Sequence, residues 1–319
     1  MTNENSQNKK IKLIFMGTPE FATKPLLSLI SADNFEIKAI FTNPDEKIGR
    51  KQTISAPPIK KIALNFNLPF YQPIKIKETE SVIKNIAPDL IIVVAYGHLI
   101  PQNILDIPKY GCINIHGSLL PKYRGSACLQ APILNGDKES GVTIMKMNAR
   151  LDTGPILKQA KIDLSFDENI ITINNKLSAL SAEILIPVLN EYLAGDIKEQ
   201  EQNESEATYV KMIKKEDGQI DFNKSASQIE KMTRAFYVWP GTWFNLTIDG
   251  IKKKKIKILQ TEKKVLAGNF AEAGQFFKYN NQLGLQCGQD ALIILSLQIE
   301  GKDATTGYEF MNGHRNLIK

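Results

Sequence analysis

The unbroken apolar run from Leu90 to Tyr96 is the feature that most constrains how this chain folds. A strand with one face in water alternates apolar and polar residues, whereas an unbroken run is typical of a strand covered on both faces. Comparable runs at Lys12–Met16 and Ile37–Thr42 precede it. Helical patterns at Glu20–Ile30 and Ile76–Ile86 separate these runs. The alternation predicts an open, mostly parallel, Rossmann-like α/β sheet. Further strands are expected at Leu68–Tyr71, Cys112–His116 and Val142–Met147.

The sequence changes character near residue 196. Residues 196–206 are rich in Asp and Glu and have no apolar periodicity, which is typical of a linker. Beyond them, one helical segment at Ala226–Phe236 is followed by short alternating runs separated by Gly, Asn and Asp, which predict a smaller, OB-like β-barrel. We therefore expect a catalytic domain at 1–195, a linker at 196–207 and a barrel domain at 208–319, since 319 residues suffice for two domains.

Charge supports this division. All of the net charge of +6 lies after residue 207, and four consecutive lysines, Lys252 to Lys255, account for much of it. Such an asymmetry indicates a nucleic-acid-binding module in the second part. The polar N-terminus lacks a signal-peptide core, and no apolar run approaches the ~20 residues that span a bilayer. We therefore expect a cytoplasmic protein without membrane association.

Several site classes are excluded by spacing. The three cysteines form no CxxC pair, and Cys112 and Cys128 are interpreted as small buried hydrophobic residues. The three histidines are too scattered for a metal site. The turn after Met16 lacks the three-glycine dinucleotide fingerprint, and the chain has no P-loop.

The segment that carries chemistry is Cys112–Pro121. Alternate residues of a strand share a face, so Asn114 and His116 project together. Gly117 ends this strand, and ligands of open α/β sheets bind beyond the carboxyl ends of the strands. An amide beside an imidazole can donate hydrogen bonds to an oxyanion, and one such donor is worth roughly 10²–10³ in rate.

A second polar position, Asp152, follows the strand at Val142–Met147 on a tight Asp-Thr-Gly-Pro loop. If this loop lies beside the Cys112–His116 strand, the carboxylate pairs with His116 and favours its charged form. Ser118 would be the nucleophile of a Ser-His-Asp hydrolase, but the residues around it do not form the Gly-x-Ser-x-Gly elbow.

Together, Asn114-x-His116-x-Ser118-Leu119-Leu120-Pro121 and the later Leu151-Asp152-Thr153-Gly154 resemble the signature of the folate-dependent formyltransferases. Four further segments resemble the members of that family that act on methionyl-tRNA, and the resemblance runs from about Ile11 to Leu297. These segments are Phe15–Ala22, Val93–Gly97, Pro121–Gly125 and Arg234–Trp243.

The resemblance implies transfer of a formyl group from 10-formyltetrahydrofolate to the α-amine of methionyl initiator tRNA. Asn114 and His116 would stabilise the tetrahedral oxyanion. Asp152 would orient His116 and assist proton removal from the amine, with no metal required. The implied folate contacts are Ser118, Leu119, Leu120, Pro121, Tyr96 and Gly97.

The implied contacts with tRNA lie in two basic segments. One is a loop insertion with Arg50 and Lys51, and the other is the run Lys252, Lys253, Lys254 and Lys255, where phosphate contact competes with a solvated hairpin as the interpretation. Trp239 and Trp243 are interpreted as core residues rather than base-stacking ones. We expect a monomer.

Two alternatives remain. A formyltransferase for an amino sugar or another small amine would share the catalytic residues, and the amino-sugar enzymes would also keep a similar second domain. A non-catalytic tRNA-binding protein would not require Asn114, His116 and Asp152 together.

Overall fold

The computed structural model describes residues 10–48, 52–248 and 252–319. Its backbone contacts divide the chain into two compact units. Unit 1 comprises Met1–Cys128, Ser140–Ile162 and Asn174–Lys211, and unit 2 comprises Leu129–Glu139, Asp163–Ile173 and Met212–Lys319.

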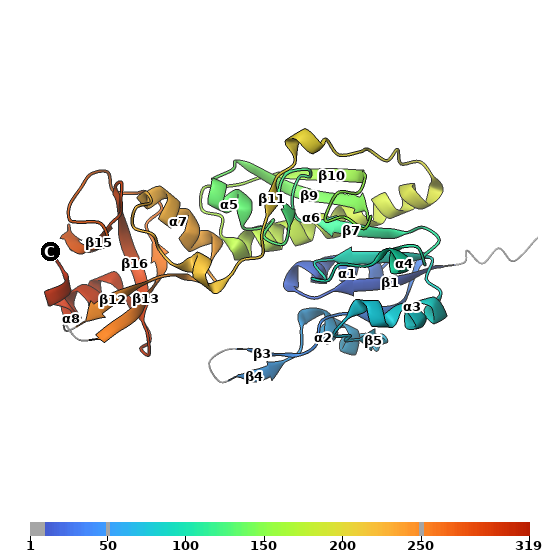
Figure 1. Ribbon diagram of the computed structural model, residues 1–319, viewed down its shortest axis with the longest axis horizontal. Helices are drawn as coiled ribbons and strands as arrows, with labels where there is room; N and C mark the ends of the chain where they lie inside the picture. The colour runs from blue at the N-terminus through green and yellow to red at the C-terminus, as the bar shows by residue number, and fades with distance from the viewer. Residues whose placement is uncertain (1–9, 49–51, 249–251) are drawn as a thin grey trace, which may run out of the picture. The chain divides into compact units, whose positions relative to one another are not determined.

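Unit 1 is built on a seven-stranded sheet with the order β10-β9-β7-β6-β1-β2-β5 (Figure 1). The strands from β7 to β5 pair in parallel, and β9 runs antiparallel to β7. The bounds are β1 (Ile11–Gly17), β2 (Phe35–Phe41), β5 (Phe70–Tyr71), β6 (Leu90–Val94), β7 (Cys112–His116), β9 (Glu139–Lys146) and β10 (Ile156–Asp163). The mostly parallel sheet expected from the sequence is confirmed.

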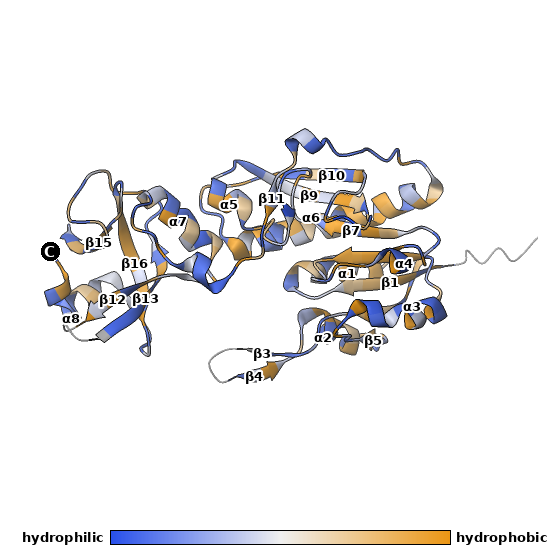
Figure 2. Cartoon of the chain, viewed as in Figure 1, coloured by the Kyte–Doolittle hydropathy of each residue, from blue (hydrophilic) through white to orange (hydrophobic). Residues whose placement is uncertain are grey.

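The apolar run that dominates the sequence forms the central strand β6, and all five of its residues are buried. Strand β1 beside it and strand β7 on its other side are also largely buried, and Figure 2 shows hydrophobic colouring along β1 and β7. The remaining named elements are short helices and ladders: α1 (Thr23–Ile30), β3 (Glu46–Ile48), β4 (Thr53–Ser55), α2 (Pro58–Asn65), α3 (Glu80–Ile86), α4 (Gln102–Leu105), β8 (Arg124–Gly125) and β11 (Tyr209–Val210), with the 3₁₀ turns Glu20–Ala22, Ile76–Thr79 and Glu204–Glu206.

The long helix α6 (Ile170–Ala194) is apolar and long enough, by length and composition, to cross a membrane. Its fully buried positions recur at every fourth residue through Leu177, Ser181, Leu185 and Leu189. A buried stripe of this period is what a helix packed against a protein core requires.

Unit 2 is an antiparallel β domain with the strand order β12-β13-β16-β15-β14 and β17 paired to β16. Its strands are β12 (Thr242–Ile248), β13 (Lys252–Thr261), β14 (Phe276–Tyr279), β15 (Gln282–Gln286), β16 (Ala291–Ile299) and β17 (Ala304–Thr306), and its helices are α5 (Ala131–Asn135), α7 (Ala226–Ala235) and α8 (Gly307–Gly313), with 3₁₀ turns at Lys215–Gly218 and Arg315–Leu317. Alternate residues of β13 and β16 point into one apolar core, which includes Ile256, Ile258 and Leu297. A small second β domain therefore follows the α/β domain, as the sequence predicts.

The acidic segment expected as a linker belongs to unit 1. The backbone of Gln200 exchanges two hydrogen bonds with Ile156, and β11 pairs in parallel with β8. The division by contacts also assigns the stretches 129–139 and 163–173 to unit 2. Long-range pairing of this kind leaves no trace in local composition, and the expected boundaries therefore remain a prediction.

Candidate active site

Strand β7 carries Asn114 and His116 at its carboxyl end, between β6 and β9. The alternation expected from the sequence sets Ile113 and Ile115 at 0 and 1% exposure, while Asn114 and His116 keep 8 and 6%. The two polar side chains are thus nearly removed from water. Hydrogen bonds and charges act strongly in such surroundings because little solvent screens them.

The loop after β9 brings Asp152 to these two residues. One carboxylate oxygen of Asp152, Oδ1, lies 3.5 Å from Nδ2 of Asn114. The other, Oδ2, lies 3.7 Å from Nδ1 of His116 and accepts a hydrogen bond of 2.8 Å from the backbone N–H of Gly125. Asn114 and His116, which precede Asp152 by 38 and 36 positions in the chain, therefore both lie beside its carboxylate.

The protonation of His116 follows from its neighbours. Its Nε2 lies 2.9 Å from the carbonyl oxygen of Tyr123, which only accepts, so Nε2 carries a hydrogen. Burial alone lowers the pKa of His116, but Cys128, Asp152 and the Tyr123 carbonyl together outweigh it and raise the pKa from 6.5 to about 9. His116 is therefore an imidazolium at neutral pH: its Nε2–H donates to the Tyr123 carbonyl, while its Nδ1, at 3.7 Å from the Asp152 carboxylate, is too far from that oxygen for a hydrogen bond.

Cys128 is a site residue that sequence reasoning missed. It is half-buried, and its thiol forms a side-chain hydrogen bond with His116. The interpretation of Cys128 as a buried hydrophobic residue is therefore wrong, whereas Cys112, with 2% exposure, fits that description. Only the fold brings the two side chains together, and no spacing in the sequence signals it.

The turn from Ser118 to Pro121 is held by hydrogen bonds that Ser118 forms with Lys122 and Thr143. The hydroxyl of Ser118 donates to the carbonyl of Lys122 at 2.6 Å, and Thr143 donates to the carbonyl of Ser118 at 2.7 Å. Ser118 is fully buried and Leu120 is 3% exposed, while Leu119 and Pro121 are half-buried. Ser118 thus holds the turn through its hydroxyl group.

Tyr96 and Gly97 follow β6 and differ in accessibility. The ring of Tyr96 is 2% exposed and packs in the apolar cluster that includes Ile100 and Ile104. Gly97 is exposed and has φ +85°, a left-handed conformation that glycine adopts at little cost. Contact with a ligand at this position would therefore use the backbone.

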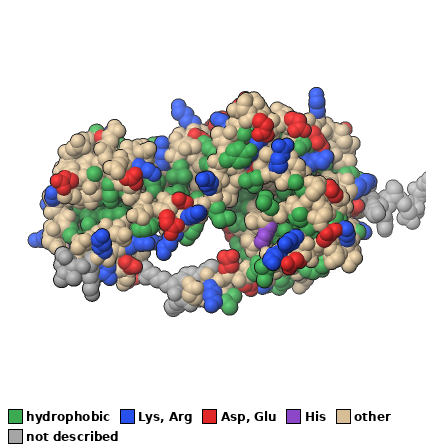
Figure 3. Space-filling view, viewed as in Figure 1, with side chains coloured by type: hydrophobic (Ala, Val, Ile, Leu, Met, Phe, Trp, Pro, Cys, Tyr) green, Lys and Arg blue, Asp and Glu red, His purple; other side chains and the backbone are tan. Residues whose placement is uncertain are grey.

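The lysine run of unit 2 lies on β13, where pairing with β12 divides it between two faces. Trp243 stands opposite Lys257 and Asn245 opposite Lys255, so Lys253, Lys255 and Lys257 share one face. Lys254 lies on the other face, the face that also carries the buried Ile256. Figure 3 shows Lys and Arg side chains spread among hydrophobic ones on the side of the molecule that it displays.

Lys255 caps an aromatic ring. Its ammonium lies 3.6 Å from the ring centroid of Trp243, and Nε1 of Trp243 donates to the carbonyl of Lys215 at 3.3 Å. Burial, followed by the nearby charges of Lys215 and Lys257, lowers the pKa of Lys255. Trp243 is 8% exposed, as expected of a core residue, but Trp239 is 54% exposed and its assignment to the core is wrong. Arg50 and Lys51 lie outside the described residues, as does the side chain of Lys252.

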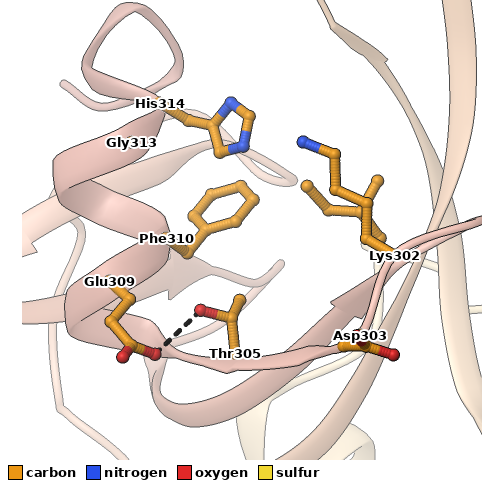
Figure 4. Close-up of a pocket in the computed structure, with 8 residues that line it drawn as sticks. Lys302, Asp303, Thr305, Glu309, Phe310, Gly313 and His314 are labelled. Atoms are coloured by element: carbon orange, nitrogen blue, oxygen red, sulfur yellow. Dashed lines mark hydrogen bonds between the residues drawn. The ribbon is translucent and has the colours of Figure 1, made fainter.

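Unit 2 also holds a cavity of about 160 Å³. Figure 4 shows the ring of Phe310 below His314, with Lys302 across the cavity from both. The hydroxyl of Thr305 donates a hydrogen bond to the carboxylate of Glu309. None of the residues that line it belongs to the β7 site. Within the described ranges, no three His, Cys, Asp or Glu side chains are placed to hold a metal ion.

Comparison with known proteins links this geometry to a family. Residues 9–189 match the model described as formyl transferase, and residues 212–315 match the model of the formyl transferase C-terminal domain. A protein of Geobacter sulfurreducens named methionyl-tRNA formyltransferase is 40% identical over 96% of this chain and 94% of its own length. A protein of the same name from Thermodesulfovibrio yellowstonii is 42% identical over 95% of this chain and 96% of its own length.

Solved structures share the fold at lower identity. HypX from Aquifex aeolicus has a TM-score of 0.65 at 14% identity, covering 98% of this chain and 50% of its own. WlaRD, a sugar 3N-formyl transferase, has a TM-score of 0.61 at 21% identity, covering 92% of this chain and 99% of its own. At such identities the likeness concerns the fold alone.

Proposed function

The chain belongs to the formyl transferase family, and we propose that it transfers the formyl group of 10-formyltetrahydrofolate to the α-amine of methionyl initiator tRNA. The observation that carries the proposal is the convergence of Asn114, His116 and the Asp152 carboxylate beyond the end of β7. Relatives at 40 and 42% identity over nearly the whole chain bear the name of that activity.

The first step is attack of the neutral amine on the formyl carbon, which forms a C–N bond and turns the formyl oxygen into an oxyanion. Asn114 and His116 supply the donors for that oxyanion. The contact of 3.5 Å between Asn114 and Asp152 is long for a hydrogen bond, so the amide hydrogens remain free to turn toward a developing charge. Because little solvent reaches this site, such donors stabilise the developing charge more strongly than they would in water.

The site both accepts and returns the proton that the reaction moves. The attacking nitrogen loses one proton, and N10 of the leaving tetrahydrofolate gains one as its bond to the formyl carbon breaks. Asp152 is the base for the amine because its carboxylate lies beside both Asn114 and His116, where the reacting groups would meet. The same pair returns the proton to N10, and the site ends in the state in which it began.

We assign the folate contacts to the turn Ser118–Pro121 and to Tyr96–Gly97. Leu119, Pro121 and the Gly97 backbone are the accessible parts of these segments. The buried Ser118, Leu120 and Tyr96 support them from behind.

For tRNA, Lys253, Lys255 and Lys257 offer phosphates one shared face of β13, and Lys254 lies on the opposite face. Arg50, Lys51 and Lys252 belong to the same proposal. A cytoplasmic, monomeric enzyme acting away from membranes completes it.

The decisive experiment incubates the purified protein with 10-formyltetrahydrofolate and methionyl initiator tRNA. Formylmethionyl-tRNA is the expected product, measured by acid gel or mass spectrometry after deacylation. A nucleotide-linked amino sugar offered in place of the tRNA is the control. Formylation of the sugar without formylation of the tRNA would favour the amino-sugar alternative, and binding of tRNA without turnover of either would favour a non-catalytic protein.

A further inference from the structure

The side chain of Gln202, in the acidic segment that composition marks as a linker, connects two parts of unit 1. Its Nε2 donates to the backbone carbonyls of Asp152 at 2.9 Å and Gly154 at 2.7 Å. Its Oε1 accepts from Nη2 of Arg124 at 2.8 Å and from Nε at 3.1 Å. Arginine only donates and carbonyls only accept, so a single orientation of the amide satisfies all four contacts.

Arg124 gives this connection a rigid anchor. Its side chain is fully buried, and its Nη1 and Nη2 each donate to one carboxylate oxygen of Glu204 at 2.9 Å. Nη1 also donates to the hydroxyl of Tyr209 at 2.8 Å. The paired strands β8 and β11 carry Arg124 and Tyr209 directly opposite each other, so the backbone ladder holds the two side chains next to each other.

The loop held by Gln202 needs such support. Asp152 has φ +52°, a left-handed conformation that non-glycine residues rarely adopt unless their surroundings enforce it. Gly154 lies so close to the carbonyl oxygen of Lys146 that a Cβ would stand 1.8 Å from it. The amide of Gly125 fixes the Asp152 carboxylate on one side, and Gln202 fixes the backbone on the other.

We infer that Gln202 is a positioning residue, which holds the Asp152 loop in the conformation that formyl transfer requires. Its amide ties that loop to Arg124, so the Asp152 carboxylate keeps facing Asn114 and His116. The inference rests on the proposed function of the β7 site, but the geometry of the loop can also be followed without turnover.

The test uses Gln202→Glu and Gln202→Met in the full-length protein. The glutamate still accepts from Arg124 but has no hydrogen for the two carbonyls, and the methionine keeps the volume without either contact. Gln200→Glu is the matched control because its exposed side chain lies in the same segment and gains the same charge. Steady-state kcat and KM for both substrates, thermal unfolding and the NMR titration of His116, one of only three histidines, are measured.

We expect both Gln202 variants to lose about 10- to 100-fold in kcat with KM nearly unchanged, because small misplacements of a catalytic group are costly. In Gln202→Met the His116 titration should move down from about 9, since the Asp152 carboxylate no longer faces it. Gln200→Glu should match the wild type in every measurement. Variants that keep kcat and the titration, or that change KM alone, would overturn the inference. If the wild type itself forms no product, the proposed function fails, and the titration still decides whether Gln202 positions the loop.

Discussion

The β7 site and the lysine face of β13 use charge in opposite ways. At β7, an imidazolium and a carboxylate lie 3.7 Å apart with side chains 7 and 13% exposed, and each group depends on the other. On β13, like charges stand at every second residue of a strand, and Lys253 is exposed. Buried groups act through geometry and lose much when one partner is removed, whereas exposed charges act together and are screened by salt.

Asp152→Asn should give the largest effect. The amide keeps the shape of the carboxylate but can neither take the proton of the amine nor sustain the imidazolium. We expect kcat for formyl transfer to fall roughly 10²–10⁴-fold, and the unfolding temperature to fall as well because His116 loses its charged partner. Asp196→Asn, the same change at an exposed position of unit 1, is the control. A residual rate within threefold (about 0.7 kcal/mol) of the wild type would remove Asp152 from the mechanism.

The ion pair of His116 and Asp152 should give an effect of intermediate size, seen in how the free energy of unfolding changes with pH. Because the folded pKa of about 9 lies above 6.5, the paired imidazolium stabilises the fold fully below pH 6.5. This contribution, up to about 3 kcal/mol by linkage, is lost as the pH rises toward 9. Urea unfolding of the wild type and of His116→Gln between pH 6 and pH 9.5 isolates it. A difference between the two proteins that stays constant over this range would contradict the raised pKa.

Single lysine substitutions on β13 should have the smallest effects. Lys253→Gln and Lys257→Gln should each weaken tRNA binding only a few-fold and reduce the slope of log affinity against log salt by about 1. Lys278→Gln, an exposed change on β14, should leave the slope unchanged. The slopes of the wild type and the three variants are measured by filter binding from 50 to 200 mM salt. Equal slopes for all four proteins would mean that this face does not contact tRNA, and the contrast with the β7 site would no longer hold.

The local pattern of apolar and polar residues predicted the strands correctly wherever burial repeats over a few residues. The runs at β1 and β6 predicted central strands because burial on both faces leaves few polar positions. At β7, the alternation of Asn114 and His116 with isoleucines predicted a strand on which the two polar side chains share a face. Strand β10 was not predicted, because its residues after Ile156 and Leu157 are mostly accessible and mix Lys, Gln and Asp.

Other features depended on partners far along the chain. Gln202 lies 50 residues from Asp152 and 78 from Arg124, so composition classed its segment as a linker. Trp239 looked like a core residue from its Pro and Gly neighbours, yet it is exposed. A residue's own neighbours indicate its periodicity, but not which distant surface covers it.

The sequence by itself therefore determined the α/β and β parts, the polar pair on β7 and the family resemblance, all of which depend on residues close together or on motifs kept intact. Only the tertiary structure decided that Asp152 reaches both partners, that Cys128 contacts His116, and that Arg124 and Gln202 hold the loop. These contacts close distances of 12 to 78 residues, and their partners meet only when the core is packed.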